Sequence, residues 1–446
     1  MIEEIKKFAN DFLEKTNKRN IILISHFDTD GITSAAILGK ALKRLDKKFS
    51  FNIIKSLEPE FIKTLEKEEN KILVFLDLAS ASLKELGELK NQVFIIDHHE
   101  IKKEDIPVNV IVLNPHLFEG EEMSSSCLTY LVSKEIAKKD ANSADLAIIG
   151  MVGDLYETKI GPLVNSIFKD GEVTIKKGLL LYPSTRPLNK ALEYSSNPYI
   201  PGVTGNAYGV IDVLREANIS FSQKGYKALI ELEEEEMRRL VTAITLRMPD
   251  HSGIQNFLGN LFLVKFFNRL EDARELSALI NACSRMDEYN IALLFCMGNE
   301  TARKKAEEIY IRYKQSLIAA LNHVNNSSKI QGTQYVIMNA QDKIQDTIIG
   351  TVASIMSMSS LYREGTIIIT MAYNEDKIKV SSRICGRDKC EDDPRNLRDL
   401  MNEITELIGG QSGGHKLAAG CIIDKDKETA FIDLVKKKLD IEVVKV

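Results

Sequence analysis

Short apolar runs rich in β-branched residues alternate with amphipathic stretches over the first 160 residues of the chain. This alternation is typical of an α/β domain in which helices cover a parallel sheet. We expect strands at Ile21–Ser25, Phe51–Ile54, Ile72–Leu76, Val93–Ile96 and Val110–Leu113. We expect helices at Ile32–Leu45, Pro59–Glu66, Ala81–Leu89, Ser126–Lys138 and Ala144–Tyr156.

Aspartates and histidines follow the ends of these predicted strands. They occur in HFDTDG after the first run, after ILVFL, after VFII, and in a Gly-Asp pair late in the last of these helices. Ligands of open parallel α/β sheets bind in the crevice outside the carboxyl ends of the strands, so we expect these side chains to converge. They are His26, Asp28, Asp30, Asp77, Asp97, His98, His99 and Asp154.

This set of side chains predicts a metal site. So many carboxylates cannot stay ionised close together unless a strong positive charge lies among them. Carboxylates with imidazoles and no thiolate favour Mn²⁺ or Mg²⁺ over structural Zn²⁺, and about six ligands favour two ions over one. Alone, Asp30 or Asp77 would be explained by helix capping or turn formation. Four such segments on successive elements of one sheet indicate a site.

The same segments resemble the four motifs of the DHH phosphoesterase superfamily, with matching order and spacing. That superfamily includes RecJ exonucleases, oligoribonucleases and cyclic-dinucleotide phosphodiesterases, which hydrolyse phosphoesters with two Mn²⁺ or Mg²⁺ ions. The resemblance implies that His26, Asp28 and Asp77 bind one ion. It implies that the other ion is bound by Asp30, Asp77, His98 and Asp154, with Asp77 bridging. Asp97 would support the ligands, and His99 would face the nucleophile or the phosphate.

A glycine-rich segment near the end of the chain, SGGHKLAAG, resembles the signature of the DHH-associated carboxy-terminal domain. The resemblance implies that His415, Gly413 and Gly414 bind the substrate backbone, while Ser412 replaces a glycine of the signature. Arg383, at the end of a predicted strand, fits a phosphate-binding position of that family. The alternatives are a simple glycine-rich loop and a solvated edge arginine.

Two further segments carry reactive side chains. The segment from Asn281 to Arg285 resembles the Asn-Ala-x-x-Arg segment of RecJ-type enzymes, in which the arginine would pair with phosphate. The alternative is an arginine that satisfies the last carbonyls of a helix. Cys385 and Cys390 have no second pair nearby, so a zinc site is not expected there.

The pattern along the chain divides it into three parts. We expect a parallel-sheet DHH domain over residues 1–160, a helical connector over 161–328, and a smaller α/β DHH-associated domain over 329–446. The connector is expected to hold helices at Ser222–Arg247, Arg269–Ala282 and Glu300–Ala320. The last part is expected to hold a hairpin joining Gly365–Tyr373 to Lys377–Ile384 and helices at Thr347–Leu361, Leu397–Ile408 and Thr429–Leu439.

Composition limits the partners and the compartment. The formal charge is −5, from 59 Lys and Arg against 64 Asp and Glu, so nucleic acid would have to meet a local basic surface. Six cysteines without C-x-x-C spacing indicate reduced thiols. The amino terminus lacks the features of a signal peptide and no apolar run reaches ~18 residues, which favours a cytoplasmic protein without a membrane segment.

The resemblance covers essentially the whole chain and is strongest to archaeal RecJ-like exonucleases. It implies a two-metal exonuclease that degrades single-stranded DNA, with RNA left open, to 5′-mononucleotides in replication or repair. It implies as protein partners the GINS replisome complex or a superfamily 2 helicase. The alternatives are a short-oligonucleotide or cyclic-dinucleotide phosphodiesterase, and a replisome scaffold of the same fold. No motif reports the digestion polarity or the preference between DNA and RNA.

Overall fold

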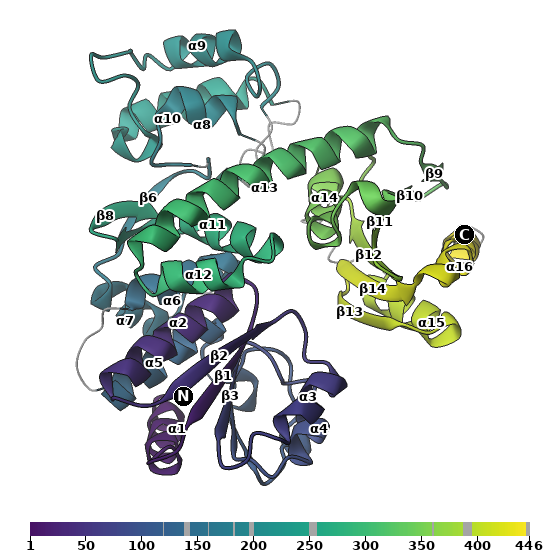
Figure 1. Cartoon of the computed structure of the whole chain (residues 1–446). Coiled ribbons are helices and arrows are strands. Elements are labelled where there is room, and N and C mark those ends of the chain that lie inside the picture. Colours follow the sequence, from purple (N-terminus) through teal and green to yellow (C-terminus); the bar gives the residue numbers. More distant parts are fainter. Residues whose placement is uncertain are drawn as a thin grey trace. The chain divides into compact units, whose positions relative to one another are not determined.

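The computed structural model describes residues 1–118, 120–137, 143–158, 160–181, 183–195, 200–248, 257–358, 361–386 and 395–442. The chain forms two compact units, Met1–Glu307 and Glu308–Val446 (Figure 1). Both units combine helices with a sheet, which confirms the expected α/β class. The helix α13 (Glu300–Asn326) contains the border between the two units.

The first unit begins with a five-stranded parallel sheet in the order β2-β1-β3-β4-β5. All five strands coincide closely with the expected runs. They are β1 (Ile21–His26), β2 (Phe49–Ile54), β3 (Ile72–Leu76), β4 (Val93–Ile96) and β5 (Val110–Leu113). The helices around them are α1 (Ile2–Lys15), α2 (Thr29–Arg44), α3 (Pro59–Leu65), α4 (Leu83–Gly87), α5 (Ser125–Ala137) and α6 (Ala144–Gly153). The expected end of one helix, Lys138, lies outside the described residues.

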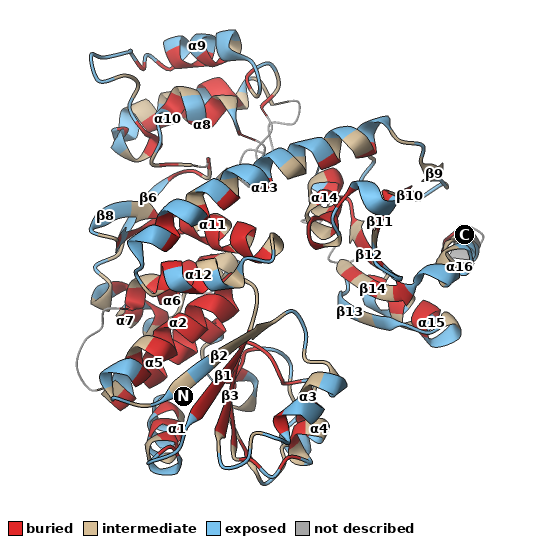
Figure 2. Ribbon diagram, viewed as in Figure 1, coloured by how far each residue is buried: buried red, intermediate tan, exposed pale blue. Residues whose placement is uncertain are grey.

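The inner strands β1, β3 and β4 of this sheet are buried, which explains why their sequences are almost continuously apolar, whereas the edge strand β2 is only half-buried (Figure 2). On one face, Phe75 and Ile95 pack in a cluster with Leu65 of α3 and Leu86 of α4. On the other face, Phe94 of β4 meets Phe8 and Phe12 of α1 edge to face, with ring centroids 5.4 and 5.2 Å apart. The sheet is therefore a rigid frame for the side chains that follow its strands.

The rest of the first unit mixes helices with a small antiparallel sheet in the order β6-β7-β8. Its strands are β6 (Thr174–Leu179), β7 (Leu258–Phe266) and β8 (Arg269–Asp272). Its helices are α7 (Pro162–Asp170), α8 (Leu188–Glu193), α9 (Ala207–Glu216), α10 (Glu234–Thr245), α11 (Ala273–Arg285) and α12 (Tyr289–Cys296). Helices α8, α9 and α10 share a hydrophobic core that includes Leu192, Val213 and Leu240 and extends to Leu179 of β6 and Leu261 of β7.

Two expected helices of this region begin later than the sequence pattern predicted. The helix predicted from Ser222 is wrong in its first part, because the helix there begins only at Glu234. The pattern from Arg269 was wrong in its first four residues, which form β8 and pair with β7. Phe267 and Asn268 join the two strands with φ of 49° and 57°. Such a turn usually contains glycine, so the hairpin gave no turn signal in the sequence.

The second unit is built on a six-stranded sheet in the order β13-β14-β12-β11-β10-β9. Helices α15 and α16 contribute to the hydrophobic core on one face, and α14 packs on β11 and β12. The strands are β9 (Ile330–Gln331), β10 (Tyr335–Asn339), β11 (Ile367–Asn374), β12 (Lys377–Ile384), β13 (Gln411–His415) and β14 (Ala418–Asp424). The helices are α14 (Asp346–Met358), α15 (Leu397–Ile408) and α16 (Glu428–Glu442). The expected β11–β12 hairpin and all three helices are present, although α14 ends at Met358 and residues 359 and 360 of the expected helix lie outside the described residues. The glycine-rich segment forms strands β13 and β14.

Candidate metal centre

The register of the first sheet brings three strand ends side by side. Ser25 of β1 pairs with Leu76 of β3, and Leu76 pairs with Ile96 of β4. The residues that follow these positions are His26, Asp77 and Asp97, so adjacent strands deliver them to one edge of the sheet. Asp77 has a φ of 60°, in the left-handed region that Asp adopts more readily than most residues.

The first turn of α2 holds the next two carboxylates. Asp28 is the N-cap of this helix, and its Oδ1 accepts a hydrogen bond of 3.0 Å from the backbone N–H of Gly31. A Cβ on Gly31 would lie 2.3 Å from the carbonyl oxygen of His26, so only glycine permits this close approach of the helix to β1. Asp30 follows within the same turn and is fully buried.

The last carboxylate comes from the end of α6. Asp154 is the C-cap residue of this helix. Leu155 follows it with a φ of 59°, which is an unusual conformation for a bulky residue. This turn of the chain places Asp154 and Tyr156 next to the same imidazole, that of His98.

The side chains that could hold a metal form three groups among the described residues, and all three share Asp77. Two of them are the predicted ligand sets, which are His26, Asp28 and Asp77, and Asp30, Asp77, His98 and Asp154. The third group is Asp77, Asp97, His98 and His99. Within each group, the candidate ligand atoms all lie within 4.8 Å of one another. The first two groups coincide with the two ligand sets expected from the sequence, although their binding of metal stays a prediction.

The distances between these atoms fit a metal of the Mg²⁺ or Mn²⁺ type. His26 Nδ1 lies 2.9 Å from Asp28 Oδ2 and 3.5 Å from Asp77 Oδ2. His98 Nε2 lies 3.3 Å from Asp77 Oδ1 and 3.2 Å from Asp154 Oδ2. Octahedral bonds of 2.0–2.1 Å place neighbouring ligand atoms about 3 Å apart. Among the described residues, His26 Nδ1, Asp77 Oδ2 and His98 Nε2 are buried without a hydrogen-bond partner. Coordination of a cation would satisfy these atoms.

The pKa shifts of the clustered side chains also favour binding of a cation. Burial and the neighbouring carboxylates raise the pKa of Asp77 and of Asp154 well above their ordinary value. Burial also raises the pKa of Asp30. Burial lowers the pKa of His26, but Asp28 and Asp77 raise it by more, so the net pKa lies well above the usual range. Without added positive charge, the cluster therefore holds protons that a bound cation would displace.

Asp97 lies outside these two ligand groups, and its hydrogen bonds show what it holds in place. Its Oδ1 lies 2.7 Å from His99 Nδ1, and its Oδ2 accepts bonds of 2.6 and 3.1 Å from the hydroxyl and backbone N–H of Ser80. The backbone N–H of His98 also donates to this carboxylate at 2.8 Å. Although burial raises the pKa of Asp97, these bonds hold it below its ordinary value. Asp97 therefore fixes the orientation of His99 and of the backbone that carries His98.

Several supporting residues were missed by the sequence analysis. The backbone N–H groups of Ser125 and Ser126, at the start of α5, donate to the two oxygens of Asp30 at 2.7 and 3.1 Å. The Ser125 hydroxyl donates to Asp77 at 3.1 Å. The run of serines before a helical pattern is an N-cap signal that could have indicated a helix terminus there. Ser80 and Tyr156 carried no such signal, because their roles depend on contacts between distant segments.

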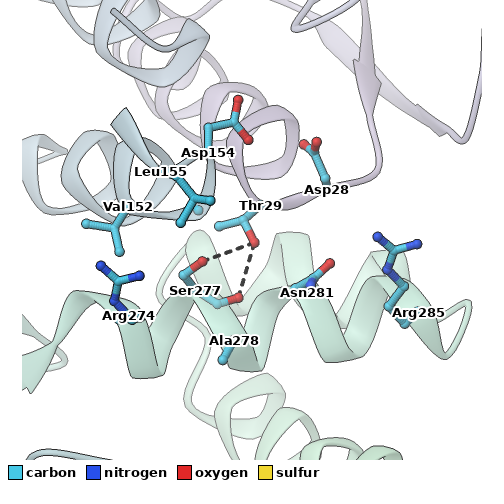
Figure 3. Close-up of a pocket in the computed structure, with 11 residues that line it drawn as sticks. Asp28, Thr29, Val152, Asp154, Leu155, Arg274, Ser277, Ala278, Asn281 and Arg285 are labelled. Carbon is cyan, nitrogen blue, oxygen red and sulfur yellow. Dashed lines mark hydrogen bonds between the residues drawn. The ribbon is translucent and has the colours of Figure 1, made fainter. Parts of the chain in front are cut away.

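A cavity of about 290 Å³ adjoins the carboxylate cluster (Figure 3). One side carries Asp28 and Asp154, and the other is α11, which presents Asn281 and Arg285. The guanidinium of Arg285 lies over the ring of Phe27, 5.4 Å from its centroid. The structure thus brings Arg285, the last residue of α11, to the wall of the same cavity as two of the predicted metal ligands.

Helix α11 is fastened to this wall by polar contacts. The Thr29 hydroxyl donates to the carbonyl oxygen of Ser277 at 3.1 Å (Figure 3). Arg274 forms an ion pair with Glu157 and also lines the cavity. Burial lowers the pKa of Arg274 to about 10.

The remaining predicted substrate residues lie in the second unit. Arg383 of β12 and His415 of β13 both pair with Ala418 of β14, so they share one row and one face of the sheet. The Nε of Arg383 donates to the Ser354 hydroxyl of α14 at 3.0 Å, while His415 is exposed.

The two glycines of β13 differ in their surroundings. A Cβ on Gly413 would meet no atom within 4 Å, whereas Gly414 has a φ of 124° and its Cβ would lie 2.5 Å from the carbonyl oxygen of Ala418. Gly413 pairs with Gly420 and shares the face of His415. The Ser412 hydroxyl donates to the Asn402 side chain of α15 at 2.7 Å, so the residue that departs from the family signature packs on that helix.

The cysteines show no metal-binding arrangement within the described residues. Cys127, Cys283, Cys296, Cys385 and Cys421 are buried thiols, and Cys390 lies outside the described residues. None of the described helices is both long and apolar enough to cross a bilayer.

Three family models match the chain in succession. Residues 20–151 match the DHH family N-terminal domain, residues 181–256 the DHH-CID domain, and residues 332–440 the DHHA1 domain. An uncharacterised protein of Methanocaldococcus jannaschii is 28% identical over 97% of each chain.

Solved structures share the fold at low sequence identity. RecJ of Thermus thermophilus in complex with Mn²⁺ is 17% identical with a TM-score of 0.60, covering 98% of this chain and 54% of its own. This chain therefore spans about half the length of that RecJ, which is also matched in complex with Mg²⁺. CDC45 of Entamoeba histolytica is 13% identical with a TM-score of 0.66 and 98% of both chains covered.

Proposed function

The chain belongs to the DHH family, and from this we propose that it is a two-metal exonuclease of single-stranded nucleic acid. The substrate we propose is single-stranded DNA, with RNA as the second candidate, and the products are 5′-mononucleotides. The observation that carries this proposal is the pair of ligand groups that share Asp77. The similarity to the fold of RecJ agrees with it.

The proposed chemistry is hydrolysis of a phosphodiester. Two divalent cations held by these ligand groups would lower the pKa of a bound water and neutralise charge on the phosphate. Asp77 offers one oxygen to each ligand group, because its Oδ2 faces His26 and its Oδ1 faces His98. Asp30 is held in place by the start of α5.

His99 is proposed to hold a proton for the substrate. Burial lowers the pKa of His99, but its bond with Asp97 raises it by more, so the net pKa lies above the ordinary value. A protonated imidazole whose Nδ1–H is fixed by a carboxylate presents its Nε2–H as a donor. We assign this donor to a phosphate oxygen or to the leaving oxygen.

We propose that the three parts of the chain have different roles. Residues 1–160 carry the metal ligands, 161–328 connect, and 329–446 bind the strand. In the last part, Arg383, Gly413, Gly414 and His415 are the proposed contacts to the substrate backbone. In the first part, Arg285 is proposed to pair with a phosphate, since it lines the cavity beside Asp28 and Asp154.

The experiment that tests this function uses short DNA and RNA strands labelled separately at each end. They are incubated with the full chain in Mn²⁺, in Mg²⁺ or in chelator. Asp77→Asn is the test variant, because Asn tolerates the positive φ at this position. Asp105→Asn, at an exposed turn, is the matched control. Metal-dependent release of mononucleotides by wild type and control, but not by Asp77→Asn, supports the proposal and reports the polarity.

The same experiment distinguishes the alternatives. If dinucleotides are cleaved while longer strands survive, the protein is a short-oligonucleotide or cyclic-dinucleotide phosphodiesterase. If the protein binds Mn²⁺ by calorimetry and cleaves none of these substrates, the replisome scaffold becomes the better proposal, a reading that the similarity to CDC45 favours. Copurification with a GINS complex or a superfamily 2 helicase tests the proposed partners.

A further inference from the structure

The two adjacent histidines of the candidate metal centre have different hydrogen-bond partners. His99 Nδ1 faces the carboxylate of Asp97 at 2.7 Å, whereas His98 Nδ1 lies 3.1 Å from the phenol oxygen of Tyr156. The Tyr156 ring also packs against the His98 ring, with centroids 5.2 Å apart. Tyr156 lies outside the motifs noted in the sequence, in the turn that follows Asp154.

The chemistry of His98 requires a definite tautomer. Its Nε2 is buried and lies 3.2–3.3 Å from oxygens of Asp154 and Asp77. A neutral imidazole has one N–H, so Nε2 can offer a lone pair to a cation only when the proton is on Nδ1. The Nδ1–H then needs an acceptor, and the Tyr156 oxygen is within hydrogen-bond distance.

We propose that Tyr156 is a positioning residue that holds His98 in the Nδ1–H form and so turns the Nε2 lone pair toward Asp77 and Asp154. This inference rests on the proposed metal centre and adds a residue that the ligand sets do not contain. The phenol oxygen accepts the Nδ1–H while the ring contact limits rotation of the imidazole.

The backbone at this point supports the assignment. Leu155, between Asp154 and Tyr156, has a φ of 59° and is 63% exposed, so its own side chain gains little from this conformation. Strain of this kind persists where the surroundings impose it. Here the turn brings both Asp154, a predicted ligand, and Tyr156 next to the imidazole of His98.

The test removes only the hydroxyl. Tyr156→Phe keeps the ring contact, and Tyr130→Phe is the matched control because its hydroxyl donates to Asp170 at 2.9 Å, away from the cluster. Loss of such a supporting bond typically weakens metal binding 10- to 100-fold. We expect a loss of about this size for Mn²⁺ in calorimetry of the full-length Tyr156→Phe protein and an unchanged affinity in Tyr130→Phe.

A second measurement reads the tautomer directly. In protein labelled with ¹⁵N-histidine and saturated with Mg²⁺, we expect a long-range ¹H–¹⁵N correlation spectrum to show the His98 proton on Nδ1, with the signal assigned by its loss in His98→Gln. In Tyr156→Phe this population should fall. An unchanged Mn²⁺ affinity together with an unchanged His98 tautomer would overturn the inference. Wild type that binds metal through this tautomer but cleaves no strand would instead overturn the proposed function and leave the inference standing.

Discussion

The Nδ1 atom of His99 lies 2.7 Å from Oδ1 of Asp97, two residues before it in the chain, while Ser80 donates twice to the other oxygen of the same carboxylate. The carboxylate thus joins the segment of Ser80 to its own segment, Asp97 to His99. It orients His99 and carries its negative charge in a fully buried position.

Replacing Asp97 by Asn should lower turnover by at least about 100-fold, the usual contribution of a positioned acid or base. The amide no longer raises the pKa of His99, so the pH above which activity falls should also move to a lower value. Initial rates across a pH series measure both effects. Asp170→Asn is the control, since Asp170 also accepts two side-chain hydrogen bonds but lies outside the ligand groups. Equal pH profiles for Asp97→Asn and wild type would contradict the role given to His99.

Metal binding should appear as a gain in stability that depends on Asp77. Mn²⁺ at 100 times its dissociation constant should stabilise the wild type by about 2.7 kcal/mol. Asp77→Asn should lose most of this gain, because Asp77 belongs to both ligand groups. In chelator the variant should be at least as stable as wild type, since it removes a buried carboxylate whose pKa is raised. Thermal unfolding with Mn²⁺ and with chelator measures both, and a full Mn²⁺ effect in the variant would refute the shared role of Asp77.

The two glycines of β13 should respond differently to alanine. Gly414→Ala should destabilise the protein by more than about 1 kcal/mol, because of its positive φ and the close carbonyl of Ala418. Gly413→Ala should change stability by less than about 0.5 kcal/mol, since its Cβ would enter open space. If this face binds the strand, Gly413→Ala should still weaken binding about tenfold in fluorescence anisotropy with a labelled single strand. Wild-type binding by a stable Gly413→Ala would remove Gly413 from the proposed contacts.

Asp272 lies outside the candidate metal centre, and its raised pKa should make the stability of the protein depend on pH. Burial raises its pKa to about 6, even though the Ser184 hydroxyl and the backbone N–H of Arg274 donate to it. Folding therefore favours the protonated carboxyl. Its stabilising contribution is complete below the ordinary value of 3.8 and is lost as the pH rises through about 6.

The magnitude follows from the shift. A change from 3.8 to about 6 corresponds to about 3 kcal/mol. In Asp272→Asn this part of the pH dependence should be absent, while the amide oxygen still caps α11. Urea unfolding of both proteins between pH 4 and 7 measures the difference. Parallel stability curves for the two proteins would show that Asp272 does not titrate in this way.

The first sheet and the gathering of acidic and histidine side chains at its edge could be predicted because their signals are local. A buried parallel strand is a continuous apolar run, and the residue after it lies at the carboxyl edge. His26, Asp77 and Asp97 follow such runs directly. The β7–β8 hairpin escaped prediction because its turn contains Phe267 and Asn268 instead of glycine.

The supporting contacts could not be predicted for a different reason. Ser80 meets Asp97, and Tyr156 meets His98, across separations of 17 and 58 residues. Neither serine nor tyrosine has a pattern that distinguishes such a role from a surface position. The strands of the glycine-rich segment could not be predicted either, because glycines that permit close pairing of strands cannot be distinguished in sequence from glycines of a loop.

The N-cap of α2 fixes one predicted ligand of the candidate metal centre in the absence of a cation. One oxygen of Asp28 is tied to the backbone of Gly31, which leaves the other facing His26. A carboxylate already immobilised by its helix has little rotational entropy left to lose on coordination. Substitutions that loosen the first turn of α2 would then weaken metal affinity at the candidate centre without changing any predicted ligand, so part of that affinity would depend on helix formation.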